Sequence, residues 1–379
     1  MHIKGFCSAA LSAAVFVSGI LSTECCGLTE ADISARAAVV YEPTTGKVLF
    51  EKNKSEKLPM ASTTKIMTTL LLIENGDLDT PFTVDSEAIK VEGSSMGLVE
   101  GDIVTGRDLC AGMLLPSGND AANASAVHVS GSMEKFAELM NLRAGLIGMK
   151  NTHFVTPSGL HDDDHYSTAY DMALLASEAL KDPVFAEVCG SSSMKVHFGD
   201  PPYDRWLKNT NKLLTMCEGC IGVKTGFTDE AGRCLVSACE RNGVTLVCVT
   251  LNDRNDWQDH INMYDDAFSR IMPIEIDIGE IYENVAGSDK SSVKVINDER
   301  IIYPSADGHV PEIECRVIAP RFVYAPVREG DVIGSVQIYA DGKMTGEYEL
   351  KAAESAEYAE VSEEQEKSIW EKISDFIFG

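Results

Sequence analysis

The chain has 379 residues, of which 44% are hydrophobic and 24% charged; this composition is typical of folded globular proteins and excludes a disordered chain. One compact core rarely holds so many residues, so at least two domains are expected. The formal net charge of −27 repels phosphate backbones, so nucleic acid is not an expected partner.

Residues 1–27 predict an export signal. His2 and Lys4 precede an apolar stretch, 5–21, that is short for a membrane-spanning helix and is not followed by a stop-transfer pattern. A cleaved signal peptide is therefore favoured over an anchor. We expect an exported protein of the cell envelope, either at the outer face of the cytoplasmic membrane or secreted.

Residues 28–275 change between strand and helix patterns. Short strands are expected at 37–40 and 47–50, and a buried helical stripe over 59–73 begins near Ser62. Further helical patterns cover 106–115, 121–129, 133–147 and 257–271. Later strand patterns cover 221–227, 234–238 and 244–251, the last two joined by the hairpin turn Asn242-Gly243. This order predicts an α+β fold, with helices packed on an antiparallel sheet.

Residues 276–350 predict a small all-β domain, because short β-rich runs alternate with turns. Its expected strands are 292–296, 314–318 and 333–339. Residues 351–379 predict an acidic linker and a C-terminal amphipathic helix. The apolar stripe of this helix consists of Ile369, Trp370, Ile373, Phe376 and Ile377. We expect the helix to contact a membrane surface, with packing on the β domain or on a partner as the alternative.

Three short motifs occur in order, which we call the SxxK, SxN and KTG motifs. They are Ser62-Thr63-Thr64-Lys65, Ser117-Gly118-Asn119 and Lys224-Thr225-Gly226. Each motif alone occurs by chance in many proteins. In this order, and each in a fitting local context, the three together indicate acyl transfer through a serine nucleophile.

The SxxK motif supplies a nucleophile and its base. Residues three apart share one face of a helix, so the Lys65 amine can lie against the Ser62 hydroxyl. An ordinary serine is a poor nucleophile and needs such a base beside it. A lysine acts as a base only if burial or a neighbouring positive charge lowers its pKa, and Lys224 is expected to supply that charge.

The SxN and KTG motifs are expected to handle the substrate. Ser117, on a loop between two helices, would pass a proton to the leaving amine. Asn119 would hydrogen-bond the substrate backbone or hold Lys65. Lys224 and Thr225 would bind the terminal carboxylate of an extended peptide that pairs with the strand edge.

Three further residues complete the predicted site. Gly226 allows close backbone approach. The backbone N–H groups of Ser62 and Phe227 are candidates for an oxyanion hole. Arg254, after the next strand, is either a second contact to the substrate carboxylate or an ordinary surface arginine.

No metal or cofactor is expected. Of the eleven cysteines, Cys217 and Cys220 form a CxxC pair, which raises zinc or redox chemistry. No second CxxC or paired histidine motif completes a zinc site, so small buried thiols or one local disulfide are favoured. The His-Asp-Asp-Asp-His segment at 161–165 suggests a metal hydrolase, but it lacks a helix signature, so a solvated acidic loop is favoured.

With these motifs the chain resembles the low-molecular-mass penicillin-binding proteins that are serine-type D-Ala-D-Ala carboxypeptidases. The resemblance is carried by 61–67, 115–122, 157–160, 165–169, 209–211 and 222–228. It implies a β-lactamase/transpeptidase-like domain over 28–275 and a reaction on peptidoglycan stem peptides. Ser62 would attack the carbonyl between two D-alanines, terminal D-alanine would leave, and water would hydrolyse the acyl-enzyme. β-Lactam antibiotics would act as covalent inhibitors by acylating Ser62.

Other functions use the same motifs. A class A β-lactamase also needs a glutamate and an asparagine in a later loop; Glu138 and Asn141 have a similar spacing but lie in a helical pattern soon after Asn119. The extra β domain also argues against a β-lactamase. An endopeptidase or transpeptidase acting on cross-linked peptides would use the same residues. A wall-binding protein with an inactive site is the alternative without catalysis.

Overall fold

The computed structural model of the chain describes residues 6–12, 14–16 and 27–359. The described residues form two compact units. One lies within Ser22–Ile271, and we call it the α+β unit. The other lies within Met272–Gly379 together with Met1–Leu21, and we call it the β unit.

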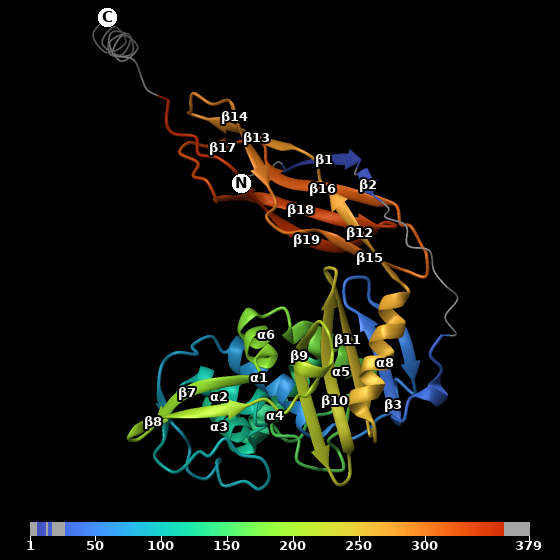
Figure 1. The fold of residues 1–379 in the computed structure, drawn as a ribbon. Coiled ribbons are helices and arrows are strands. Elements are labelled where there is room, and N and C mark those ends of the chain that lie inside the picture. Colours follow the sequence, from blue (N-terminus) through green and yellow to red (C-terminus); the bar gives the residue numbers. More distant parts are fainter. Residues whose placement is uncertain (1–5, 13, 17–26, 360–379) are drawn as a thin grey trace, which may run out of the picture. The chain divides into compact units, whose positions relative to one another are not determined.

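The α+β unit is organised around a five-stranded antiparallel sheet with the order β4-β3-β11-β10-β9 (Figure 1). The strands of this sheet are β3 (Ala37–Glu42), β4 (Lys47–Lys52), β9 (Cys220–Thr228), β10 (Gly232–Arg241) and β11 (Val244–Leu251). There are also two small two-stranded sheets. One consists of β5 (Phe82–Thr83) and β6 (Ile103–Val104), and the other of β7 (Ser193–Gly199) and β8 (Pro202–Lys208). Strand β9 is an edge strand, so one of its edges has no neighbour within this sheet.

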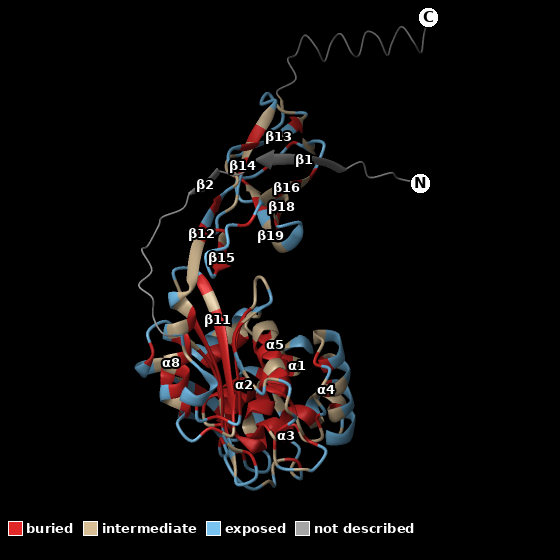
Figure 2. Ribbon diagram, turned by 90° about the vertical axis from the view of Figure 1, so that its right-hand side faces the viewer, coloured by how far each residue is buried: buried red, intermediate tan, exposed pale blue. Residues whose placement is uncertain are grey.

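Helices cover both faces of this sheet. They are α1 (Lys65–Glu74), α2 (Gly106–Leu114), α3 (Asn119–Ser130), α4 (Met133–Ile147), α5 (Ala169–Ala179), α6 (Pro183–Gly190), α7 (Leu213–Met216) and α8 (Asp256–Ser269), with 3-10 turns η1 (Glu30–Asp32) and η2 (Ala61–Thr64). Figure 2 shows α8 on one face, and α1 and α5 on the other. The predicted α+β class of this domain is confirmed.

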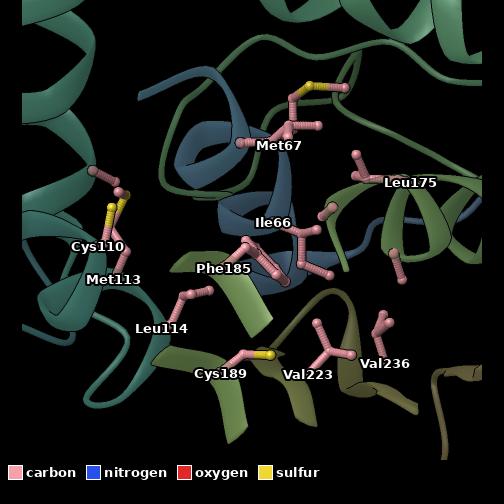
Figure 3. Packing of buried hydrophobic residues seen from close by; sticks show 14 of the residues in the cluster. Ile66, Met67, Cys110, Met113, Leu114, Leu175, Phe185, Cys189, Val223 and Val236 are labelled. Carbon is pink, nitrogen blue, oxygen red and sulfur yellow. The ribbon is translucent and has the colours of Figure 1, made fainter. Parts of the chain in front are cut away.

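Hydrophobic packing fixes the start of α1. Ile66 and Met67 are fully buried, among side chains that come from α2, α5, α6 and the sheet (Figure 3). Phe185 of α6 and Val223 of β9 belong to the same cluster. Because the two residues that follow Lys65 are locked in the core, the position of Lys65 itself is tightly determined.

Most predicted elements of this unit are confirmed; one is divided, and the short strands β5 and β6 and the elements between 169 and 216 were not predicted. The residues of the β10–β11 turn, Asn242 and Gly243, have φ of 54° and 77°, the left-handed pair that a two-residue hairpin needs. The helix predicted over 59–73 is divided into η2 and α1. No element is predicted between 169 and 216, where the structure has α5, α6, β7, β8 and α7.

The β unit contains a seven-stranded sheet with the order β1-β16-β18-β19-β14-β13-β17 and a three-stranded sheet with the order β15-β12-β2. Its strands beyond the N-terminal segment are β12 (Ile271–Asp277), β13 (Ile281–Ala286), β14 (Ser292–Ile296), β15 (Ile302–Ala306), β16 (Ile313–Pro320), β17 (Val323–Tyr324), β18 (Val332–Ala340) and β19 (Lys343–Ala352). Val336, Ile338 and Leu350 are buried in its core. The predicted C-terminal β domain, with strands at 292–296, 314–318 and 333–339, is confirmed.

The predictions for the two terminal segments remain predictions. Strand β1 (Phe6–Ser12), which pairs with β16, and β2 (Ala14–Phe16), which pairs with β12, fall within the predicted export signal. Processing of that segment stays a prediction. The predicted amphipathic helix falls mainly on 360–379, outside the described residues. Among the helices that the structure describes, none is long and apolar enough to cross a membrane.

One buried histidine ties α8 to the sheet. His260 is fully buried, with Nδ1 2.7 Å from Ser237 Oγ of β10 and Nε2 3.0 Å from Thr250 Oγ1 of β11. Burial lowers the pKa of His260 from 6.5 to about 3. Between these two values the unfolded chain binds a proton that the folded chain excludes. Folding stability contributed by the neutral ring is therefore complete above pH 6.5 and decreases as the pH falls towards 3.

We predict that His260→Gln makes the free energy of unfolding less dependent on pH in this window, by up to about 1.4 kcal/mol per pH unit. The measurement is urea unfolding of the full chain at several acidic pH values, followed by Trp fluorescence, to which Trp257 of α8 contributes. His153→Gln, at an exposed residue whose Nδ1 contacts a main-chain carbonyl, is the control and should retain the wild-type slope. An unchanged slope in His260→Gln would contradict the prediction.

Candidate active site

Ser62 lies in the 3-10 turn η2, directly before α1. Ala61 has φ of 48°, a left-handed conformation that residues with a side chain rarely adopt, so the backbone is strained beside Ser62. Thr63 closes the turn by donating its hydroxyl and its N–H to the Met60 carbonyl, at 2.6 and 3.2 Å. Ser62 is half-buried, so its hydroxyl is partly open to solvent.

The amine of Lys65 is fully buried and surrounded by three oxygens. Nζ lies 2.9 Å from Ser62 Oγ, 2.7 Å from Asn119 Oδ1 and 2.7 Å from the carbonyl oxygen of Ser158. Burial, and then the positive charge of Lys224, hold the pKa of Lys65 well below its usual range. A neutral amine can donate its two N–H groups to the amide and carbonyl oxygens and direct its lone pair at the Ser62 hydroxyl. The geometry therefore allows Lys65 to take the Ser62 proton.

The SxN motif approaches Lys65 from the start of α3. Besides holding Lys65 through Oδ1, Asn119 donates from Nδ2 to the Glu92 carbonyl and from its N–H to the Ser94 carbonyl, both at 2.7 Å. Ser117, two residues earlier, is 7% exposed and has φ of 67°. Of the two roles predicted for the Asn119 side chain, the one that the structure contains is the contact to Lys65.

Asp120 fixes the loop beside the SxN motif. Its carboxylate is buried and accepts hydrogen bonds from the N–H groups of Met96, Gly97 and Leu98, at 2.9, 3.0 and 3.0 Å. The Ser95 hydroxyl donates to the same carboxylate at 2.5 Å. Four donors from residues 95–98 satisfy this buried charge, so that part of the loop is positioned by one side chain.

The KTG motif lies on the edge strand β9. Lys224 is 1% exposed, Nζ donates to the Thr225 carbonyl at 2.8 Å, and burial lowers the pKa of Lys224 to about 7. A Cβ atom at Gly226 would lie 3.1 Å from the Met60 oxygen and 3.1 Å from the Ser62 nitrogen. The absence of a side chain at this position therefore lets β9 lie directly against the nucleophile turn, as the sequence predicts.

The remaining predicted site residues are Thr225, Phe227 and Arg254. Thr225 Oγ1 lies 2.7 Å from Thr210 Oγ1, which orients the Thr225 hydroxyl. Phe227 directly follows Gly226, and its side chain is 62% exposed. Arg254 is exposed in the turn between β11 and α8 and makes no hydrogen bond or ion pair with any residue that the structure describes. Its contact to a substrate carboxylate, like the oxyanion role of the Phe227 N–H, stays a prediction.

Two contributions come from positions for which the sequence predicts no role. The Ser158 carbonyl accepts from Lys65 at 2.7 Å. Gly159 has φ of 82°, and a Cβ atom there would lie 2.0 Å from the Ala61 oxygen. The segment 157–160 carries part of the family resemblance, yet a main-chain acceptor leaves no side-chain signal. Its function becomes visible only when the fold places it beside Lys65.

His165 holds the segment that precedes Ser158 through hydrogen bonds to its main chain. It is 3% exposed, and Nδ1 accepts the N–H groups of Val155 and Thr156 at 2.9 and 3.3 Å. Nε2 therefore carries the proton and donates to Thr64 Oγ1 at 2.8 Å. Burial lowers the pKa of His165 to about 4, so the ring is neutral near pH 7. The interpretation of 161–165 as a solvated loop is thus wrong for His165.

The described part of the chain contains no group of three or more His, Cys, Asp or Glu side chains placed to hold a metal ion. The β-lactamase alternative also has no support at Glu138 and Asn141. Glu138 is exposed on α4. The Asn141 side chain exchanges hydrogen bonds with the main chain of Phe154, at 2.7 and 2.8 Å, which is a structural role.

Comparisons with known proteins agree with this geometry. The family model described as D-alanyl-D-alanine carboxypeptidase matches residues 25–255, and the model described as penicillin-binding protein 5, C-terminal domain, matches 277–358. The chain is 32% identical to D-alanyl-D-alanine carboxypeptidase DacF of Bacillus subtilis, over 86% of each chain. It is 32% identical to DacC of Escherichia coli, over 91% of this chain and 88% of that one.

Solved structures give the same relationship. The crystal structure of a Streptomyces DD-transpeptidase is similar at a TM-score of 0.61 and 31% identity, covering 64% of this chain and 100% of that one. The structure of D-alanyl-D-alanine carboxypeptidase DacD from Francisella tularensis covers 89% of this chain and 97% of that one, with a TM-score of 0.61 and 24% identity. The latter likeness concerns the fold alone and includes most of both units.

We predict that Gly159→Ala lowers the rate at which Ser62 reacts with a fluorescent penicillin by at least about tenfold, because the added methyl group displaces the Ala61 carbonyl and with it the nucleophile turn. Gly145→Ala on α4 is the matched control, since a Cβ atom there meets nothing within 4 Å. It should leave the rate unchanged. Equal rates for the two variants would mean that contact between residues 159 and 61 does not position Ser62.

Proposed function

The chain belongs to the D-alanyl-D-alanine carboxypeptidase family and is a serine-type peptidase of that kind, and we propose that it removes terminal D-alanine from peptidoglycan stem peptides through an acyl-enzyme on Ser62. One observation carries this proposal. The Lys65 amine is bonded to Asn119 Oδ1 and the Ser158 carbonyl and lies 2.9 Å from Ser62 Oγ, so it is held as a base for that hydroxyl.

The proposed acylation step uses residues of the three motifs and Phe227. Neutral Lys65 takes the proton of Ser62 as Oγ attacks the carbonyl carbon between the two D-alanines. The negative charge that develops on the carbonyl oxygen is stabilised by the N–H groups of Ser62 and Phe227. Ser117 passes a proton to the departing amine, the C–N bond breaks, and D-alanine leaves. Water attacks the ester in the second half-reaction, with Lys65 again as the base.

Substrate orientation depends on β9. This strand has a free edge, along which an extended peptide can lie, and its Lys224 and Thr225 meet the terminal carboxylate there. Thr210 orients the Thr225 hydroxyl, and the buried Lys224 amine is held by its hydrogen bond to the Thr225 carbonyl. A free carboxylate at the end of the substrate is therefore the group that distinguishes a carboxypeptidase substrate from an internal peptide bond.

The same residues would serve an endopeptidase or a transpeptidase, which differ in the acceptor or in the bond that is cut. We also propose that the chain is exported by residues 1–27 to the cell envelope, where its substrate lies. Contact of residues 360–379 with a membrane surface belongs to the same proposal. The membrane contact is supported by the apolar stripe of that segment. Nucleic acid is not a proposed partner, because the net charge of −27 repels phosphate backbones.

We predict that wild-type protein releases D-alanine from a peptide ending in D-Ala-D-Ala and that Ser62→Ala abolishes this release, since no other hydroxyl contacts the Lys65 amine among the described residues. Release of D-alanine is measured directly, together with attachment of a fluorescent penicillin. Ser177→Ala, on α5, is a control that should retain both activities. Penicillin attachment without D-alanine release would favour the endopeptidase or transpeptidase, and the absence of both would favour the inactive wall-binding alternative.

We predict that the Ser62→Ala protein binds such a peptide more weakly as the pH rises through about 7, because Lys224 loses the charge that holds the carboxylate. The dissociation constant should increase by up to about tenfold per pH unit above that value. It is measured by calorimetry. Combining Ser62→Ala with Lys224→Arg should flatten the dependence, since guanidinium stays charged. With the exposed control Lys212→Arg the dependence should persist; constant affinity in the Ser62→Ala protein would contradict carboxylate binding by Lys224.

A further inference from the structure

Three cysteines meet where the KTG strand begins. Cys217 follows α7, Cys220 is the first residue of β9, and Cys239 lies on β10. The Sγ atoms of Cys217 and Cys239 are 3.5 Å apart, and the Cys220 thiol donates to the Gly222 carbonyl at 3.3 Å. Cys220 and Cys239 are direct partners in the pairing of β9 with β10. Cys239 thus has the Cys217 sulfur beside its own and Cys220 opposite it on the neighbouring strand.

The surroundings favour the thiolate form of Cys217 and Cys220, whose pKa values are lowered, and the protonated form of Cys239, whose pKa is raised. The hydrogen bond from Cys239 first, and then Arg241, whose Nη2 lies 3.8 Å from the sulfur, lower the pKa of Cys217 to about 7. By contrast, burial raises the pKa of Cys189 and of Cys234 to about 12. Cys217 is therefore available as a thiolate near neutral pH, whereas Cys189 and Cys234 stay protonated.

The three cysteines differ in how far they are exposed to solvent. Cys239 is fully buried and Cys217 is 7% exposed. Cys220 is only partly buried, and its neighbours Glu218 and Gly219 are exposed. An oxidant in solution thus meets Cys220 first, while the shared partner Cys239 is reached only from within the cluster.

We propose that Cys217, Cys220 and Cys239 form a thiol–disulfide site that reacts with a soluble disulfide and joins Cys239 to either of the other two cysteines. In the first step the Cys220 thiolate attacks one sulfur of the oxidant, forming a mixed disulfide and releasing one thiolate. Cys239 then passes its proton to the Cys217 thiolate, whose sulfur lies 3.5 Å away, and attacks Cys220 Sγ, which releases the second thiolate. Two protein thiols are oxidised, and one external disulfide is reduced to two thiols.

The bond can then move within the cluster. The Cys217 thiolate attacks Cys239 Sγ, and Cys220 leaves as a thiolate, so the number of disulfides is unchanged. In either form the beginning of β9, or the turn before it, becomes covalently tied to β10. Lys224 lies four residues after Cys220 on the same strand, so this tie would restrain the strand that carries the KTG motif.

The test uses peptide mapping of the full chain. Trypsin places Cys217 and Cys220 together in the peptide 213–224, and Cys234 and Cys239 together in 234–241. Reduced protein is treated with oxidised glutathione, the remaining thiols are alkylated, and the digest is analysed by mass spectrometry. We expect a cross-linked pair of these two peptides and a loss of about 2 Da from the intact chain.

Matched variants identify the sulfurs. Cys239→Ser should abolish the linked pair, whereas Cys234→Ser, in the same peptide, should retain it. Cys217→Ser and Cys220→Ser should each retain a link, and the double variant should lose it. Fragmentation of the linked pair from wild-type protein locates the bond without any variant, in case Cys239→Ser does not fold. A link through Cys234, a bond confined to 213–224, glutathione adducts alone, or no oxidation would each overturn the proposal.

Discussion

The site depends on the burial of one amine. Removing a lysine side chain from water costs several kcal/mol unless its donors are satisfied. Here Asn119 Oδ1 and the Ser158 carbonyl, both at 2.7 Å, satisfy two N–H groups of Lys65. A third donor would require the charged form, which burial and Lys224 oppose. The constraint that makes burial tolerable therefore also leaves the lone pair of Lys65 facing Ser62, so stability and nucleophile activation have the same structural origin.

That constraint requires segments distant in sequence to meet, and two of them are loops. Loops lack the repeated backbone pairing that positions helices and strands. In this protein buried side chains replace it: Asp120 accepts main-chain N–H groups from the loop near residue 96, and His165 accepts those of Val155 and Thr156. Both acceptors are almost fully buried. The oxygens around Lys65 are consequently held by a second layer of satisfied polar groups, which resists the small displacements that weaken catalysis.

Sequence reasoning found the groups whose side chains carry chemistry and missed those that act through the main chain. The spacing of Ser62 and Lys65 is a local property of a helix start, so it could be predicted. The contribution of the Ser158 carbonyl could not, because every residue has a carbonyl and only the fold selects one. Helix α5, which was not predicted, had a detectable signal. Thr168 caps it by accepting the N–H of Asp171, and Met172, Leu175, Ala176 and Ala179 form a buried apolar stripe at helical spacing. The left-handed Gly159 is recognisable only from its contact with Ala61.

The edge strand β9 carries two opposed requirements. It must keep one edge unpaired to receive an extended peptide, yet an edge strand has neighbours on one side only and is held less firmly than a central strand. Close contact of Gly226 with the nucleophile turn restrains the middle of the strand. At its first residue, Cys220, the strand pairs with Cys239, and the Cys220 N–H donates to the Cys217 carbonyl at 3.2 Å. A covalent bond at that pair would supply, at the beginning of the strand, the restraint that a second neighbouring strand cannot provide without blocking the peptide edge.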